Sequence, residues 1–225
     1  MALPAIPLDN GEVRGAIVDA QARLNVNALG GDGARADVDR GRVARLFAQR
    51  GGPIGAIAAI ADWIDRDGIV RDGGAEDAYY AARTAPGLAA NAQVLRVVEL
   101  AEVRGVSPST LAAVAPFLTA LPAGTPVNVN TAPPEVLAAI VDKLDGNGLA
   151  KLVAARAQRP FNNLAEFHAQ LPPPATLAGD ETLSVKSDYF YVTIEAQQGA
   201  TRARARALLR RRGNDWPDVV WQTVE

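Results

Sequence analysis

The chain has 225 residues, enough for one or two domains with a substantial hydrophobic core. Its net charge of -2 offers no electrostatic case for nucleic-acid binding by the whole chain, and the lack of cysteine excludes disulfides and thiolate metal sites. No apolar run is as long as the roughly 18 residues that a membrane-spanning helix needs, and no signal peptide is visible.

The N-terminal part of the chain changes its hydrophobic period. Residues 12–23 alternate apolar and polar side chains and predict a β-strand. Asn25 and Asn27 follow, and we expect both side chains to bond the backbone of a turn. The period then becomes helical, with Asp39 as the candidate cap of one helix and Pro53 as the start of the next.

An acidic segment follows this second helix. Six carboxylates fall within sixteen residues, interrupted by three glycines: Asp62, Asp65, Asp67, Asp72, Glu76 and Asp77. Oxygen donors without His or Cys favour Ca²⁺ over Zn²⁺. Because Asp62 and Asp65 are three residues apart, a helix would place them on one face. The residues alone leave two interpretations open, a loop folded around a cation and a solvated acidic loop.

The EF-hand pattern fits this segment only in part. With Asp65 at loop position one, Asp67 falls at position three and Glu76 at position twelve, which are ligand positions of that loop. Position five is Ile69, however, and position six, where the loop turns on glycine, is Val70. The sequence therefore excludes an EF-hand loop without excluding a metal.

Several helices are expected after the acidic segment. The helical spacing of apolar residues predicts one over residues 91–104 and another capped by Ser107. Thr131 is the candidate cap of a third helix, and a fourth ends near Arg156. Asn163 begins a capping-box pattern before a fifth helix.

Residues 128–167 resemble a helix-hairpin-helix unit, in which the backbone amides of the Gly146-x-Gly148 turn would hold a DNA phosphate. Phosphate binding needs a positive field. Lys143 and Lys151 supply positive charge near the hairpin, whereas Asp142 and Asp145 oppose it. We therefore favour a helical pair that serves packing alone, and keep a helix-hairpin-helix nucleic-acid-binding protein as the alternative function.

The C-terminal part is again of β type. Three strands are predicted, the first with Phe190, Val192 and Ile194 on one face: 189–196, 201–209 and 216–224. The six arginines between Arg202 and Arg212 fit either the solvated face of an exposed strand or a docking strip for an acidic partner.

With strands at both ends and helices between them, the expected fold class is α+β. We expect residues 1–24 and 184–225 to share one sheet and residues 25–183 to form a helical insertion that carries the metal loop. The only histidine, His168, has no Ser or Cys arrangement around it, and no nucleotide-binding motif occurs, so we expect no enzyme.

Four stretches, taken in order, resemble the K-type minor pseudopilin family of the bacterial type II secretion system. They are Leu24–Leu29, Asp62–Asp67, Gly74–Tyr80 and Val127–Ala132. The resemblance covers nearly the whole chain. It implies a pilin-like antiparallel sheet module with a large inserted all-helical domain, whose helical pairs are of the helix-hairpin-helix or SAM-like kind.

The resemblance also implies a metal site. It implies one or two Ca²⁺ ions in the helical domain, with four acids as the ligands: Asp65, Asp67, Glu76 and Asp77. We keep Asp62, Asp72 and Asn91 as reserve ligands.

The resemblance further implies a place in an assembly. The family's I- and J-type minor pseudopilins are the expected partners, with the H-type as a further candidate, at the tip of a pseudopilus that supports export of folded proteins across the outer membrane. The family's N-terminal transmembrane helix is missing from these residues. We therefore expect the periplasmic domain of an inner-membrane-anchored bacterial protein, with no nucleic acid or small molecule as its ligand.

Overall fold

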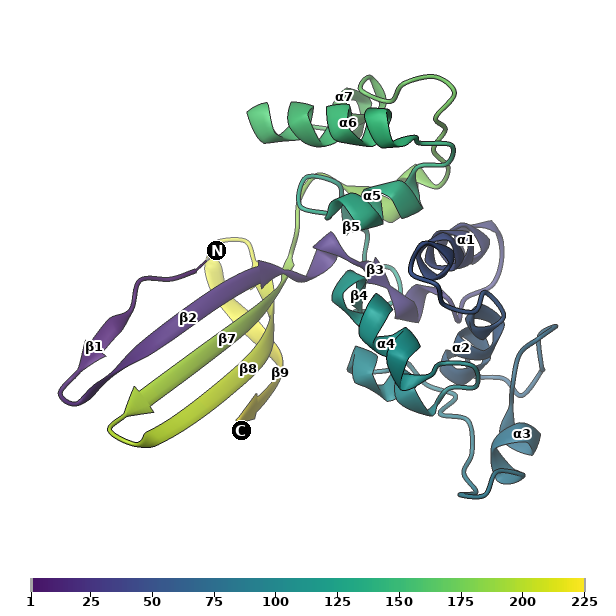
Figure 1. The fold of residues 1–225 in the computed structure, drawn as a ribbon, viewed down its shortest axis with the longest axis horizontal. Coiled ribbons are helices and arrows are strands. Elements are labelled where there is room, and N and C mark those ends of the chain that lie inside the picture. The colour runs from purple at the N-terminus through teal and green to yellow at the C-terminus, as the bar shows by residue number, and fades with distance from the viewer. Residues whose placement is uncertain (1, 225) are drawn as a thin grey trace. The chain divides into compact units, whose positions relative to one another are not determined.

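The computed structural model describes residues 2–224 and shows an antiparallel sheet together with several helices, which confirms the expected α+β class (Figure 1). The chain divides into two compact units, the sheet unit of Met1–Gln21 and Lys186–Glu225, and the inserted unit of Ala22–Val185. The sequence predicts 25–183 for the insertion, so the compact unit starts three residues earlier and ends two residues later. None of the helices within residues 2–224 is both long and apolar enough to cross a membrane.

The sheet unit is a five-stranded antiparallel sheet with the strand order β1-β2-β7-β8-β9. Its strands are β1 (Ile6–Leu8), β2 (Gly11–Asp19), β7 (Tyr189–Gln198), β8 (Thr201–Arg212) and β9 (Asp215–Val224). Because Asp19 at the end of β2 pairs with Phe190 near the start of β7, the inserted unit interrupts the chain between two neighbouring strands.

The two faces of this sheet differ in chemistry. Residues that pair across the strands share a face, and successive residues alternate between faces. One face is largely aliphatic, because Ile17, Val192 and Ala207 occupy one register row. The neighbouring row on the opposite face contains Thr193 and Arg206. Alternation of this kind is what the sequence predicts for residues 189–196.

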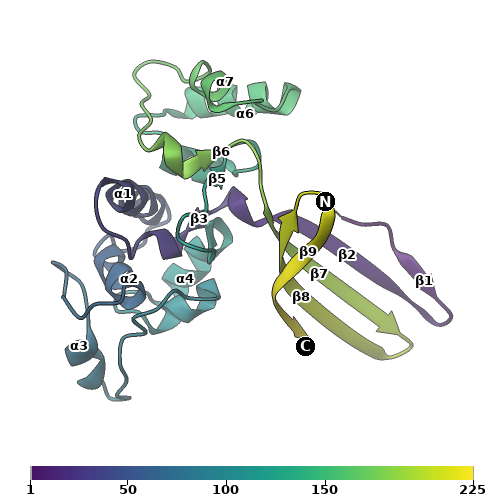
Figure 2. The ribbon, with the colours of Figure 1, turned by 180° about the vertical axis from the view of Figure 1, so that it is seen from behind.

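The inserted unit contains seven α-helices within the described residues: α1 (Ala34–Gln49), α2 (Ala56–Ile64), α3 (Asp77–Ala81), α4 (Pro108–Val114), α5 (Pro134–Ile140), α6 (Gly146–Gln158) and α7 (Leu164–His168). It is not all-helical, since two short parallel ladders join β3 (Leu24–Asn25) to β4 (Leu118–Thr119) (Figure 1) and β5 (Val127–Asn128) to β6 (Leu183–Ser184) (Figure 2). Fully buried side chains such as Leu46, Phe47, Ile60 and Leu137 form its own core.

The paired asparagines tie distant segments of this unit together. Asn25 accepts the Leu121 amide at 3.0 Å and donates to the Leu121 carbonyl at 3.1 Å. Asn27 does the same with Val94, at 2.9 Å in each direction. Asn130 likewise bonds both backbone groups of Phe161. These side chains satisfy backbone groups where no regular ladder runs, which confirms the backbone-bonding role expected for Asn25 and Asn27.

Some predicted helices are wrong in extent. No α-helix covers residues 91–104, where a 3₁₀ helix runs over Val97–Glu102 and Val98 is exposed. Asn27 bonds both backbone groups of Val94, so the residues before this short helix follow a non-helical path. The first helix starts at Ala34 rather than at an Asp39 cap.

Two other predicted helix starts move, and two caps are confirmed. The second helix begins at Ala56 instead of Pro53, and the N-cap of α5 is Pro133 rather than Thr131. The Ser107 cap of α4 and the Asn163 cap of α7 are confirmed, because each side chain accepts an amide of the first turn.

Candidate metal centre

Two helix ends deliver three carboxylates to one place in the inserted unit. Asp62 lies in the last turn of α2, Asp65 is the residue that ends this helix, and Glu76 is the N-cap residue of α3. Because Asp62 and Asp65 are three residues apart, both side chains project from the same side of α2. The three residues are buried, with exposed fractions of 0%, 6% and 4% in that order.

The three carboxylates form one compact group. One oxygen from each of Asp62, Asp65 and Glu76 lies within 4.8 Å of the other two. Buried negative charges at this separation are unfavourable unless a positive charge compensates them. The Arg71 guanidinium does so for two of them, since its Nη1 donates to Asp62 Oδ1 at 2.8 Å and also to Asp65 Oδ2. Burial acts to lower the pKa of Arg71, but the hydrogen bonds to the two aspartates outweigh it and raise that pKa overall.

Glu76 is the acid of this group that no described residue compensates. Neither of its carboxylate oxygens has a hydrogen-bond partner among the described residues, although both are buried. Burial, followed by the negative charges of Asp62 and Asp65, raises the pKa of Glu76 to about 7. Burial also raises the pKa of Asp65, against the hydrogen bond from Arg71. An unpartnered buried carboxylate beside two further carboxylates is the arrangement that a cation would complete.

The loop between the two helices is built around the Asp62 side chain. The Arg71 amide donates to Asp62 Oδ2 at 3.2 Å, and the Gly74 amide donates to the Arg71 carbonyl at 2.8 Å. A Cβ atom on Gly74 would lie 1.9 Å from Asp62 Oδ2, so only glycine fits there. The Arg104 guanidinium donates to the Gly74 carbonyl at 2.8 Å and fixes the loop from the other side.

Three aromatic rings support the start of α3. Tyr80, which is 1% exposed, packs edge-on against Trp63 and Tyr79, with ring centroids 4.9 Å and 5.1 Å away. The Arg104 amide donates to the Tyr80 hydroxyl at 3.3 Å. The aromatic residues of the acidic segment therefore hold α3, and Glu76 before it, in a fixed position.

The four predicted ligands are not all in this group. Asp65 and Glu76 belong to it, and Asp62, predicted in reserve, is its third member. Asp67 and Asp77 are exposed and bond backbone amides instead, with Oδ1 of Asp67 accepting Ile69 at 2.8 Å and Oδ1 of Asp77 accepting Ala89 at 2.9 Å. These bonds leave Oδ2 of both side chains for other use.

The two other reserve ligands differ from each other. Asp72 is exposed, whereas the Oδ1 atom of Asn91 is buried without a partner among the described residues. Asn91 also has a φ of 46°, a backbone conformation that few residues other than glycine adopt. Loop position counted from Asp65 pointed to Asp67 and Glu76. The three-residue helical spacing of Asp62 and Asp65 was the sequence signal that placed these two side chains together, although Asp62 was predicted only in reserve.

The donor set fits a hard divalent cation. The group offers only carboxylate oxygens, which suit Ca²⁺, and it contains no nitrogen or sulfur donor of the kind that favours Zn²⁺. The unpartnered oxygens of Glu76 give such an ion a place to bind.

The Gly148 amide of the helix-hairpin-helix segment is not free to bind a phosphate. Asp145 is the N-cap of α6, and its Oδ1 accepts the Gly148 amide at 2.7 Å. A carboxylate thus occupies the helix N-terminus that would receive an anion. Arg156 points inward and donates to the carbonyls of Val129 and Ala132 at 2.8 Å and 2.6 Å, so this hairpin serves packing.

Comparison with known proteins gives one consistent family. Two sequence profiles described as "Type II secretion system (T2SS), protein K" match residues 22–123 and 127–186. The type II secretion system protein K of Aeromonas hydrophila is 34% identical over 223 residues, covering 90% of this chain and 67% of the relative. Protein K of Klebsiella pneumoniae is 33% identical over 221 residues, covering 92% of this chain and 68% of the relative.

A solved structure shares the fold. The chain superposes with a TM-score of 0.82 and 24% identity on a chain of the GspK-GspI-GspJ complex from the enterotoxigenic Escherichia coli type 2 secretion system, covering 99% of this chain and 82% of that one. Fold and profiles together define a component of the type II secretion system. The chain belongs to the protein K family of that system, the K-type minor pseudopilins, which confirms the sequence resemblance.

Proposed function

We propose that this chain is a structural subunit at the tip of the type II secretion pseudopilus, where it assembles with the I- and J-type minor pseudopilins in the periplasm and supports protein export. The observation that supports this most directly is the shared fold with a chain of the solved GspK-GspI-GspJ complex. In the pseudopilus, this chain would be the periplasmic part of a membrane-anchored protein.

The size and place of the insertion support the proposed tip position. A helical filament grows when each subunit offers the next one the same heterologous surface. Here the inserted unit, Ala22–Val185, makes up most of the chain and interrupts a small sheet between two neighbouring strands. A subunit with so large an insertion would obstruct the addition of another subunit above it, and would therefore end the filament.

Gel filtration of the soluble domains of the K-, I- and J-type subunits tests the assembly directly. We expect one peak that contains all three when they are mixed at micromolar concentration. Pairwise mixtures show which contacts the ternary complex needs. Three separate peaks from the ternary mixture would contradict the proposed assembly, whatever the metal state of the chain.

We also propose that the inserted unit binds Ca²⁺ through Asp62, Asp65 and Glu76. The unpartnered oxygens of Glu76 support this site. Asp67 and Asp77 remain proposed additional ligands through their free Oδ2 atoms, and they would complete the larger oxygen shell that Ca²⁺ prefers.

Thermal unfolding with Ca²⁺ and with a chelator tests the metal. Ligand that binds only the native state stabilises it by about 2.7 kcal/mol when its free concentration is about a hundred times Kd, so Ca²⁺ should raise the melting temperature. Glu76→Gln should remove most of this shift. Glu102→Gln, at an exposed acid of the same unit, should keep it. An unchanged melting temperature together with no Ca²⁺ by native mass spectrometry would rule the site out.

A further inference from the structure

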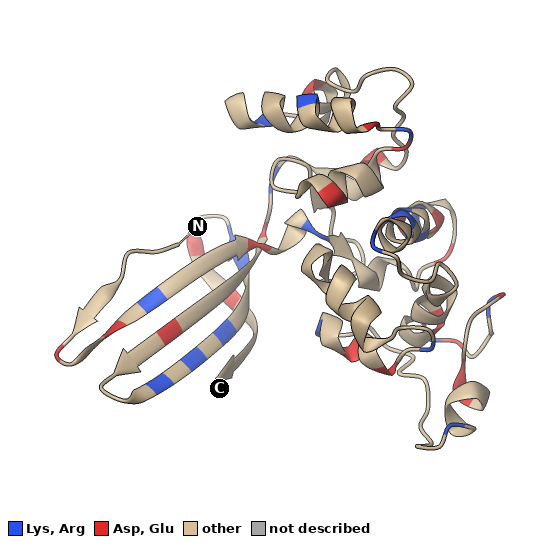
Figure 3. Cartoon of the chain, viewed as in Figure 1, with Lys and Arg blue, Asp and Glu red and all other residues tan. Residues whose placement is uncertain are grey.

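One face of the sheet unit carries a row of arginines that no described function uses. Arg202, Arg204 and Arg206 alternate with alanines along β8, so all three side chains project from the same face. Figure 3 shows blue bands, the colour of Lys and Arg, at intervals along this strand. With Arg14 of β2 and the acids Glu12 and Glu195 they form what we call the basic face.

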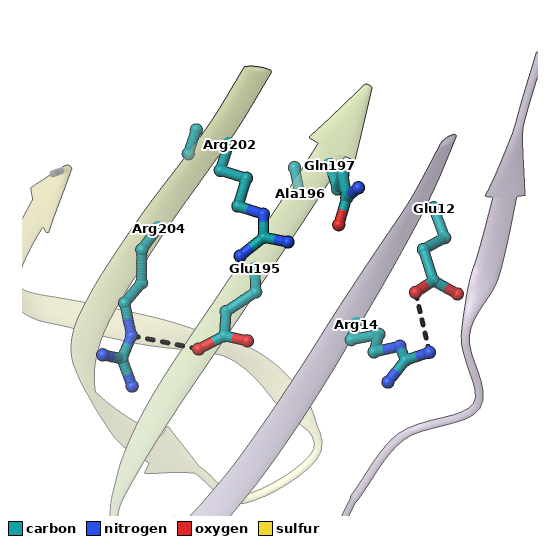
Figure 4. Close-up of a pocket in the computed structure, with 8 residues that line it drawn as sticks. Glu12, Arg14, Glu195, Ala196, Gln197, Arg202 and Arg204 are labelled. Carbon is teal, nitrogen blue, oxygen red and sulfur yellow. Dashed lines mark ion pairs between the residues drawn. The ribbon is translucent and has the colours of Figure 1, made fainter. Parts of the chain in front are cut away.

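The register fixes how these side chains lie. Arg202 pairs with Gln197, which pairs with Glu12, and Arg204 pairs with Glu195, which pairs with Arg14. Together these residues line a shallow depression of about 520 Å³, and Figure 4 shows their side chains above the same side of the sheet. The third row continues the basic face from Thr193 to Arg206.

The charges of the basic face do not cancel. Glu195 pairs with Arg204 at 3.3 Å, and Glu12 pairs with Arg14 at 2.7 Å. Arg202 and Arg206 are exposed and form no ion pair with an acid among residues 2–224. Counted over the described residues, the face therefore carries an excess of two positive charges on a chain whose overall charge is -2.

Such a row costs some stability in the free chain. Like charges that are neighbours on a sheet face repel each other, and here each unpaired arginine lies two residues from Arg204. An opposite charge from outside would remove this repulsion. Guanidinium groups also bind carboxylates through two parallel hydrogen bonds, which gives direction to the contact as well as attraction.

We propose that the basic face docks a carboxylate-rich segment of a partner protein that lies in extended conformation along β8. Residues two apart on a strand repeat every 6.4–6.8 Å or so. An extended segment with Asp or Glu at every second position has the same repeat, so two of its carboxylates, four positions apart, can face Arg202 and Arg206 on either side of the Arg204–Glu195 ion pair. The two glutamates of the face oppose a continuous polyanion such as nucleic acid, because its phosphates cannot avoid them.

This docking surface goes beyond the proposed function. The three minor pseudopilins can assemble through other surfaces, so a failed assembly and a face that does not bind carboxylates are separate results.

A titration of the ¹⁵N-labelled chain with a peptide of alternating Glu and Thr tests the proposal by NMR. At low salt we expect shifts at the amides of β8 and at the Nε–H groups of Arg202 and Arg206, with weaker binding at higher salt because these charges are exposed. The variant Arg202→Glu/Arg206→Glu should weaken binding about tenfold or more. Lys151→Glu, at an exposed residue of α6, should change it by less than about twofold.

Controls separate charge from folding and from other polyanions. Arg202→Gln/Arg206→Gln removes the two charges without adding repulsion, and it should weaken binding by an intermediate amount even if the reversed variant does not fold. Peptide binding that is equal in the wild-type and both double variants would overturn the proposal. So would an absence of shifts in β8, or tighter binding at this face by a single-stranded oligonucleotide of matched charge.

Discussion

At the scale of single residues, Arg71 and Glu76 divide the electrostatics of the candidate metal centre between them. Arg71 compensates Asp62 and Asp65 through hydrogen bonds, while Glu76 has no partner among the described residues. In the metal-free chain, the positive charge of Arg71 therefore compensates Asp62 and Asp65 but not Glu76. Since a bound cation would also face these carboxylates, the need for Arg71 should depend on whether metal is present.

Arg71→Gln tests this dependence. Without Ca²⁺ it should lower the melting temperature markedly, because removal of one member of a buried ion pair leaves an uncompensated charge and costs about 3–5 kcal/mol. With Ca²⁺ much of the loss should be recovered. Arg66→Gln, at an exposed arginine of the same loop, should have little effect in either state. An equal loss with and without Ca²⁺ would mean that Arg71 acts only through packing.

Gly74 is the residue that allows the loop to close on Asp62. Gly74→Ala should destabilise the chain by about 1–3 kcal/mol and weaken Ca²⁺ binding, because its Cβ would overlap Asp62 Oδ2. Gly68→Ala is the matched control, since a Cβ there meets nothing within 4 Å. Chemical denaturation and Ca²⁺ titration of both variants measure the difference, and similar values for the two would contradict the close fit.

At the scale of elements, the start of α7 is supported by contacts of Glu166, in its first turn, with Asn162. The Glu166 carboxylate accepts the Asn162 amide at 3.0 Å and its side-chain amide at 2.9 Å, and these bonds lower the pKa of Glu166. A lowered carboxyl pKa contributes stability above the ordinary value of 4.5, and this contribution is lost as the pH falls through the folded-state pKa.

Glu166→Gln should therefore melt at a slightly lower temperature than wild type at neutral pH, with the difference disappearing in acid. Melting curves over a pH series measure it. The control is Glu102→Gln, an exposed acid outside α7, which should show no such convergence. A difference that stays constant through the acid range would show that packing, rather than the charge of Glu166, supports the helix.

Local chemistry explains which elements could be predicted from the sequence. The caps at Ser107 and Asn163 were predictable because a side chain and an amide within the next three residues decide them. The helix expected over residues 91–104 was not, because Asn27, far away in the sequence, bonds both backbone groups of Val94. The hydrophobic periodicity of residues 91–104 gives no information about that contact.

The metal group shows the same limit. Asp62, Asp65 and Glu76 were visible as acids, but only the path of the loop decides which carboxylates are buried together. Loop positions counted from Asp65 selected Asp67, which turns its Oδ1 to the Ile69 amide instead. The insertion itself was predictable, since the switch from strand to helix period and back reflects the whole chain.

At the scale of the whole molecule, each unit contains its own tryptophan reporters. Trp63 packs on Tyr80 beside the metal group, whereas Trp216 and Trp221 lie in β9 of the sheet unit. If Ca²⁺ acts through the inserted unit, the fluorescence melting curve of Trp216→Phe/Trp221→Phe should move upward with Ca²⁺. The curve of Trp63→Phe, which reports the sheet, should move much less. Equal shifts would show that the two units unfold as one.

The pairing of β2 with β7 has a consequence for the order of folding. The two strands are neighbours in the sheet, yet the whole inserted unit separates them along the chain. Closing a long disordered loop is entropically costly, and contacts that are distant in sequence form slowly. Once the insert has folded, its two ends are close together and the remaining search is short. In pulsed hydrogen exchange during refolding, we therefore expect the amides of α1 and α2 to gain protection before those that join β2 to β7. Any factor that speeds folding of the inserted unit, bound Ca²⁺ included, would then also speed the pairing of β2 with β7.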